Sequence, residues 1–180
     1  VNLAWLVATL YLALAAFVAV FRSRSTVQLD WMPLAWAGCI FLWHLQFWWA
    51  IIELPGLVKV WTPASFLILV SLTLLLYVSA ALVLPPPESR AKESLLATFE
   101  RDGRWSLVSL SAYFAMALFA DWYFWGTPVV SRSGFLLLAL VVLPLVFLRA
   151  RSRRVQVALG LVFIPLSLWA ALELSPASYP

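Results

Sequence analysis

Four ionisable side chains stand inside long apolar stretches of the sequence: His44, Glu53, Asp121 and Glu173. Holding a charge near the centre of a bilayer costs from about 2.5 kcal/mol upward, so such residues are candidates for binding a ligand or an ion. An imidazole can also carry protons, because it titrates near neutral pH. The three carboxylates lie toward the same ends of alternate stretches. If those stretches are neighbours, we expect the carboxylates to line one outward-facing mouth.

The same residues also fit ordinary structural roles. Glu53 and Glu173 could be solvated at an interface, or paired with Lys59 or Arg132. His44 could hydrogen-bond a neighbouring helix within the protein. Asp121 has five further residues of its stretch beyond it, so we expect it to lie deeper and to need a partner. Structural and ligand-binding roles both stay open for these side chains.

Aromatic residues flank the ionisable ones. Trp43 and Trp48 lie deep in the second stretch, and Trp122 and Tyr123 directly follow Asp121. Their rings could stack on a flat apolar ligand such as a quinone or a carotenoid, or attract a quaternary ammonium group. Ordinary aromatic packing is the competing interpretation. Beyond lipid, quinone or carotenoid as candidates, no cofactor is assigned.

The sequence lacks the residues and motifs that several common kinds of chemistry require. A single cysteine, Cys39, allows no disulfide within the chain and no cysteine-rich metal site. No phosphate loop, GxGxxG, HExxH or Gly-x-Ser-x-Gly motif is present. We therefore expect no enzyme, and we assign no catalytic residue and no metal ligand.

Six apolar stretches of about 20 residues position these side chains. Hydrophobic residues make up 64% of the 180-residue chain and charged residues only 11%, far below the roughly 25% of soluble proteins. The stretches cover residues 2–21, 32–54, 63–84, 106–126, 132–148 and 155–174. We expect an all-α polytopic membrane protein, a single domain over residues 1–180 with six transmembrane helices in three hairpins. The first stretch has no basic region before it, so we expect an anchor rather than a signal peptide.

The basic residues predict an orientation. Ten of the twelve lysines and arginines fall in the first, third and fifth joints between the stretches. By the positive-inside rule these joints are cytoplasmic, so both ends of the chain are outside. We expect a multi-pass protein of a bacterial inner membrane. The net charge of +4 is explained by these joints, and nucleic acid is not an expected partner.

The third joint predicts an interfacial amphipathic helix between spans 3 and 4. Three prolines at 85–87 precede it, Leu95, Leu96 and Phe99 share one face, and Gly103 would end it. The same pattern fits a docking helix for a cytoplasmic partner.

Two parts of the chain resemble each other. Residues 22–28 are similar to residues 149–156, and residues 49–54 are similar to residues 169–174. Residues 1–54 and 130–174 would then form a parallel repeat, with chance similarity as the alternative.

The sequence is compatible with three functions. The first is a non-catalytic accessory or binding subunit of a larger membrane complex, or a homo-oligomer, that contacts lipid or an apolar ligand through its tryptophan-rich spans. The second is a transporter or channel for a small cation, proton or amine. The third is a membrane enzyme that modifies lipid.

Overall fold

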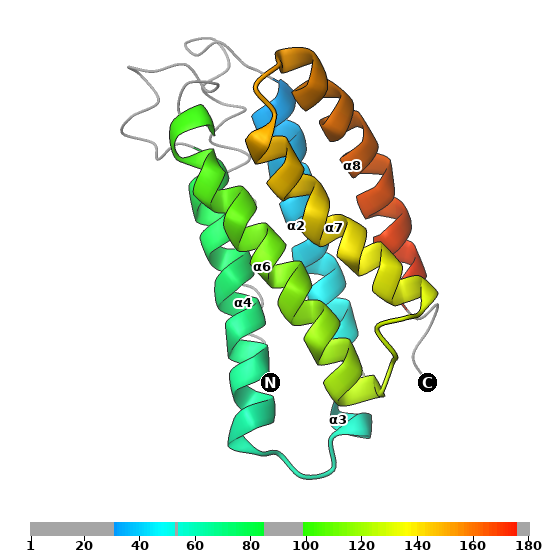
Figure 1. Cartoon of the computed structure of the whole chain (residues 1–180). Helices are drawn as coiled ribbons and strands as arrows, with labels where there is room; N and C mark the ends of the chain where they lie inside the picture. Colours follow the sequence, from blue (N-terminus) through cyan, green and yellow to red (C-terminus); the bar gives the residue numbers. More distant parts are fainter. Residues whose placement is uncertain (1–30, 53, 85–98, 176–180) are drawn as a thin grey trace.

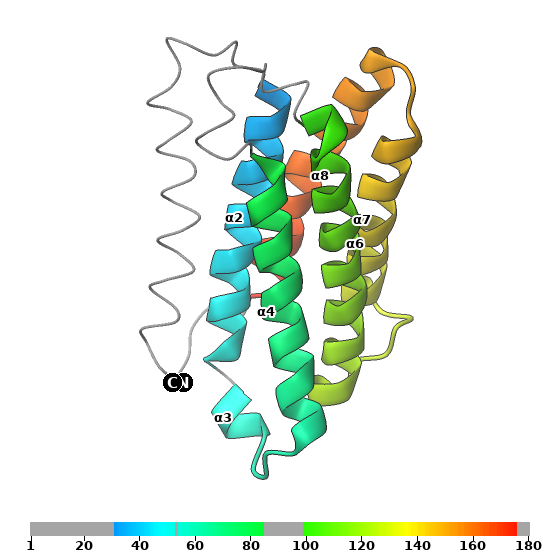
Figure 2. The same ribbon diagram turned by 90° about the vertical axis from the view of Figure 1, so that its left-hand side faces the viewer.

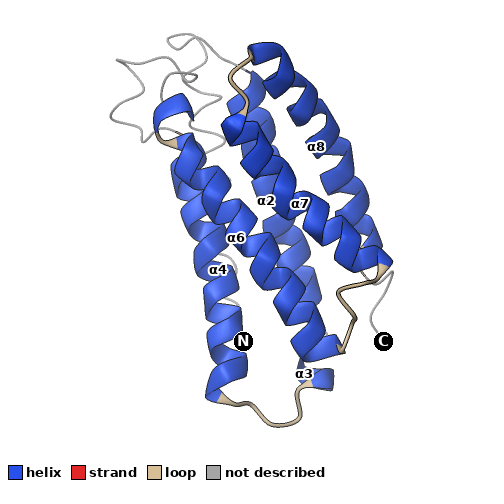
Figure 3. Ribbon diagram, in the orientation of Figure 1, coloured by secondary structure: helices blue, strands red, loops and turns tan. Residues whose placement is uncertain are grey.

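The computed structural model describes residues 31–52, 54–84 and 99–175, and these ranges are helical with no strand among them (Figure 3). Their elements follow in chain order: α2 (Trp31–Ile51), α3 (Leu54–Leu57), α4 (Pro63–Val83), α6 (Gly103–Ala120), the π-helix η2 (Asp121–Trp125), α7 (Arg132–Arg149) and α8 (Arg153–Glu173).

Five of these helices are long and apolar enough to cross a membrane. The all-α membrane class is therefore confirmed, and the five spans begin and end within three residues of the predicted stretches. The first stretch, residues 2–21, lies outside the described residues, as does most of the predicted interfacial helix. The six-span count, the three hairpins and the parallel repeat stay predictions.

The five long helices form a closed ring (Figures 1 and 2). In this ring α2 packs against α4, α4 against α6, α6 against α7, and α7 against α8, which returns to α2. Neighbours in sequence run antiparallel, whereas α8 and α2 run parallel (Figure 1). Each helix therefore packs against a neighbour on both sides.

Aromatic rings fill the interior of the ring. The Trp43 ring lies 4.8 Å from Phe114, and the Trp36 ring lies 4.4 Å from Phe163. All four side chains are buried, and Trp43 Nε1 also donates a hydrogen bond of 3.4 Å to Ser167 Oγ. Rings of this size let α2 reach α6 and α8 across the interior, so one core joins three helices.

Serines join α4 to α6. Ser106 Oγ donates to the Ser79 carbonyl at 2.7 Å, and Ser79 Oγ donates to the Ser106 carbonyl at 3.1 Å. One turn away, Ser109 Oγ donates to the Leu75 carbonyl at 2.8 Å. Small side chains of this kind let the two backbones approach closely.

The helix ends are set by local chemistry. Thr62 and Ser65 form a capping box at the start of α4, where Pro63 occupies the first helical position. Gly126 ends η2 with a φ of 66°, a left-handed conformation that favours glycine. Residues 99–101 are helical, Asp102 forms a turn and α6 begins at Gly103, so the helix boundary expected at Gly103 lies one residue earlier.

Candidate functional site

A cavity of about 270 Å³ lies toward the end of the bundle at which α3 and η2 are placed. Its walls come from all five long helices as well as from these two short ones. We call it the acidic cavity, because the side chains of Asp121 and Glu173 both line it. Glu53, the third predicted acid, lies outside the described residues.

The charge of Glu173 is offset by a neighbour. Its Oε1 lies 3.2 Å from a guanidinium nitrogen of Arg132, at the start of α7. The same guanidinium lies 5.5 Å from the centre of the Trp169 ring. Glu173 therefore makes the ion pair that the sequence allowed as its structural role.

Asp121 is placed differently. It is the first residue of η2 and is half-buried. Its carboxylate makes no hydrogen bond or ion pair with any residue that the structure describes. A carboxylate that loses part of its hydration without gaining a partner is destabilised, so this position favours the arrival of a cation or a hydrogen-bond donor.

Aromatic rings surround this carboxylate. Trp43 and Phe47 of α2 face Tyr113 of α6 across the cavity, with ring centres 6.3 and 6.4 Å from Tyr113. Phe124 and Trp125 of η2 complete the aromatic lining. The faces of such rings carry partial negative charge and attract cations when water is excluded.

Helical spacing explains why these residues meet. Tyr113, Ala117, Asp121 and Phe124 follow one another at intervals of three or four residues and so share one face of α6 and η2. The same spacing brings Trp43, Gln46 and Phe47 together on α2. Phe47, Tyr113, Phe124 and Trp125 were not among the site residues predicted from sequence, although their helical spacing is visible there.

The other predicted site residues lie elsewhere. His44 is 5% exposed and outside the cavity lining, and its Nδ1 donates to the Ile40 carbonyl at 2.9 Å. Trp48 packs edge-on against Phe47, with ring centres 5.7 Å apart, and also does not line the cavity. His44 therefore makes a bond within its own helix, whereas the prediction from sequence considered bonds between helices.

Trp122 and Tyr123 point away from the cavity. Their exposed fractions are 54% and 41%, and both rings pack against Phe119 on the outside of the bundle. The side chains one and two positions after Asp121 turn away from the cavity, and Phe124, three positions after it, returns to the face of Asp121. These two residues suit contact with lipid headgroups.

The π-helical turn is itself a feature of the site. α6 widens into η2 at Asp121, and the N–H of Gly126 closes the turn on the Trp122 carbonyl at 3.1 Å. Single π-helical turns are rare and are frequent at functional sites. Here the turn carries Asp121, Phe124 and Trp125 into one cavity.

No group of three histidine, cysteine, aspartate or glutamate side chains in the described ranges is placed to hold a metal ion. Comparisons of the chain with protein families, with curated proteins and with solved structures found no match.

Proposed function

We propose that this chain is a non-catalytic, multi-pass membrane protein that binds a small organic cation in the acidic cavity. The observation that carries the proposal is the unpaired carboxylate of Asp121 among aromatic rings. A bound ammonium group would supply the partner that this carboxylate lacks. Contact with the ring faces would add about 2 kcal/mol where the site is desolvated.

The cavity also limits the size and charge of the ligand. Its volume of about 270 Å³ lies just below the usual range of about 300–1,000 Å³ for small-molecule sites. Glu173 is already paired with Arg132, so Asp121 supplies the net negative charge. A singly charged amine with one apolar group fits both limits better than a large quinone or carotenoid.

We place this cavity on the outer face of a bacterial inner membrane. The support is the charge distribution, because Arg104, Arg149 and Arg153 lie at the opposite ends of their helices from Asp121 and Glu173. Basic ends remain on the cytoplasmic side of such membranes.

Binding of benzyltrimethylammonium to the purified full chain, measured by isothermal titration calorimetry, tests the proposal. We expect Asp121→Asn to weaken binding by about tenfold or more, the equivalent of about 1.4 kcal/mol. Asp102→Asn is the matched control, because Asp102 is at the other end of α6 and pairs with Arg101 at 3.0 Å. Unchanged affinity in Asp121→Asn, with normal thermal unfolding, would refute the proposal.

A neutral probe separates this proposal from the apolar ligand expected from sequence. Benzyl alcohol carries the same ring without the charge, so it should bind more weakly than benzyltrimethylammonium and should not respond to Asp121→Asn. Equal binding of the two probes would favour a site for apolar molecules. Uptake of benzyltrimethylammonium into proteoliposomes would then distinguish transport from binding alone.

A further inference from the structure

A second and larger cavity lies at the opposite end of the bundle. Its volume is about 510 Å³, and it is formed by the start of α2, the start of α6, the end of α7 and the start of α8. We call it the basic cavity, because the described residues that line it include four arginines and one glutamate: Arg104, Arg149, Arg151, Arg153 and Glu100. α7 begins beside the acidic cavity and ends beside the basic cavity, so the two cavities lie toward opposite ends of the bundle.

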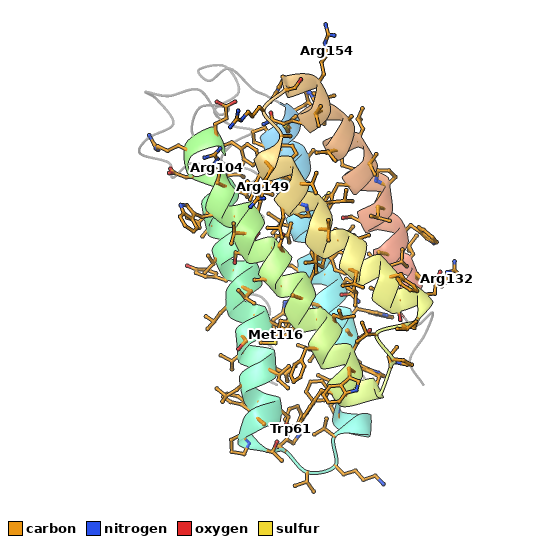
Figure 4. All side chains as sticks on the ribbon, in the orientation of Figure 1. Trp61, Arg104, Met116, Arg132, Arg149 and Arg154 are labelled. Carbon is orange, nitrogen blue, oxygen red and sulfur yellow. The ribbon has the colours of Figure 1, made fainter. Side chains whose placement is uncertain are left out.

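The four arginines lie closer together than the orientation of the protein in the membrane requires. The positive-inside rule asks only that basic residues lie in the cytoplasmic joints, not that they surround one hollow. Arg154 meets that requirement while pointing away from the bundle (Figure 4). By contrast, Arg104 of α6 and Arg149 of α7 line the same cavity.

Three of the four arginines, Arg104, Arg149 and Arg151, are not paired with a carboxylate among the described residues. Arg104, Arg149 and Arg151 make no hydrogen bond or ion pair with another described residue, and Arg153 donates to Met32 Sδ at 3.4 Å. Like charges held around one hollow repel each other, most strongly where water is partly excluded. A bound anion would remove this repulsion.

Apolar side chains form the inner wall of the basic cavity. Phe99, Leu107 and Phe147 line it on the side of the protein core, together with Leu148 near the end of α7. The cavity therefore has a cationic rim at the end of the membrane spans and an apolar wall deeper in the bundle. A phospholipid has the same order of groups at the junction of its headgroup and its acyl chains.

From this arrangement we propose that the basic cavity binds the phosphate group of an anionic phospholipid. Guanidinium groups recognise phosphate oxygens through two parallel hydrogen bonds, with Arg104 and Arg149 on two sides of the cavity. α8 begins at Arg153 on the rim, and its dipole places partial positive charge there. Basic pockets between membrane helices are a recognised type of site for such headgroups.

Native mass spectrometry of the full chain in detergent micelles tests the site. The probes are phosphatidylglycerol and phosphatidylcholine with identical acyl chains, which differ only in headgroup and net charge. The wild type should retain phosphatidylglycerol at about tenfold lower concentration than phosphatidylcholine. Arg104→Gln combined with Arg149→Gln should abolish this preference.

Two single variants keep the test decisive. Arg154→Gln removes a neighbouring charge that does not line the cavity, so it should leave the preference unchanged. Glu100→Gln removes a negative charge from the lining, so it should strengthen the preference even if the double variant fails to fold. Loss of preference in Arg154→Gln equal to that in the double variant, or no response to Glu100→Gln, would overturn the site.

Inorganic phosphate distinguishes a lipid from a soluble anion. If the acyl chains contribute through the apolar wall, millimolar phosphate should not displace phosphatidylglycerol from the wild type. If inorganic phosphate displaces phosphatidylglycerol when the two are at equal concentration, the cavity binds a water-soluble phosphate. That result would overturn the lipid assignment.

Discussion

Asp121 and Glu173 line one cavity but have different electrostatic surroundings. Arg132 offsets the charge of Glu173, and the pair is partly open to solvent, with side-chain exposures of 67% and 33%. Such pairs contribute about 0.2–1 kcal/mol. Among the described residues, the negative charge available to a ligand therefore belongs mainly to Asp121. The charge of Glu173 is neutralised as long as its ion pair with Arg132 is intact.

The Arg132 pair predicts a gain of affinity. Arg132→Gln frees Glu173, so benzyltrimethylammonium should bind more tightly, by up to about fivefold, in isothermal titration calorimetry. The gain should shrink as salt is raised, because salt screens charges that water reaches. Lys59→Gln removes an equal charge that does not line the cavity and should leave the affinity unchanged. A gain of similar size in both variants would point to general surface charge instead.

At the scale of elements, α4 and α6 are joined by hydrogen bonds from serine side chains to backbone carbonyls of the facing helix. Ser79 and Ser106 each donate to the carbonyl of the other, so both hydroxyls are satisfied inside the bundle. Ser111 lies on the same helix as Ser106 and is equally buried, yet its Oγ has no hydrogen-bond partner among the described residues. Two serines of one helix thus have opposite energetic roles.

Alanine substitutions should separate these roles. Ser106→Ala removes bonds to Ser79 and should destabilise the protein by about 1 kcal/mol, within the range measured between membrane helices. Ser111→Ala removes a buried hydroxyl without a partner, so stability should stay equal or rise by up to about 1 kcal/mol. Thermal unfolding in a single detergent measures both. Equal destabilisation by the two substitutions would mean that Ser111 has a partner outside the described residues.

The elements were more predictable from sequence than the site. Five spans were predicted to within three residues, because an apolar stretch must be long enough to cross the bilayer. Asp121 could be identified from sequence as a candidate, because a carboxylate inside an apolar span is energetically costly. Its neighbours Trp122 and Tyr123 could not be its partners, because the helix turns them outward. The meeting of Arg104 with Arg149 depends on the order in which α6, α7 and α8 pack, which composition and periodicity do not encode.

The whole molecule has two chemically distinct ends. The acidic cavity lies at one end and the basic cavity at the other. Between them, the interior of the ring of described helices is filled by Trp36, Phe114 and Phe163, each at most 3% exposed. This packing favours two separate binding sites, one for each face of the membrane.

The acidic and basic ends of the bundle also predict how the protein is oriented in the membrane. This orientation can be measured directly. Arg154→Cys places a thiol at the basic end, and Val130→Cys places one at the acidic end, where Val130 is 80% exposed. In intact cells a membrane-impermeant maleimide should label only Val130→Cys, whereas in inverted vesicles it should label only Arg154→Cys. The native Cys39 is 5% exposed and should give no background. The reverse pattern would place the cation-binding cavity in the cytoplasm, and its ligand would then have to be an intracellular amine.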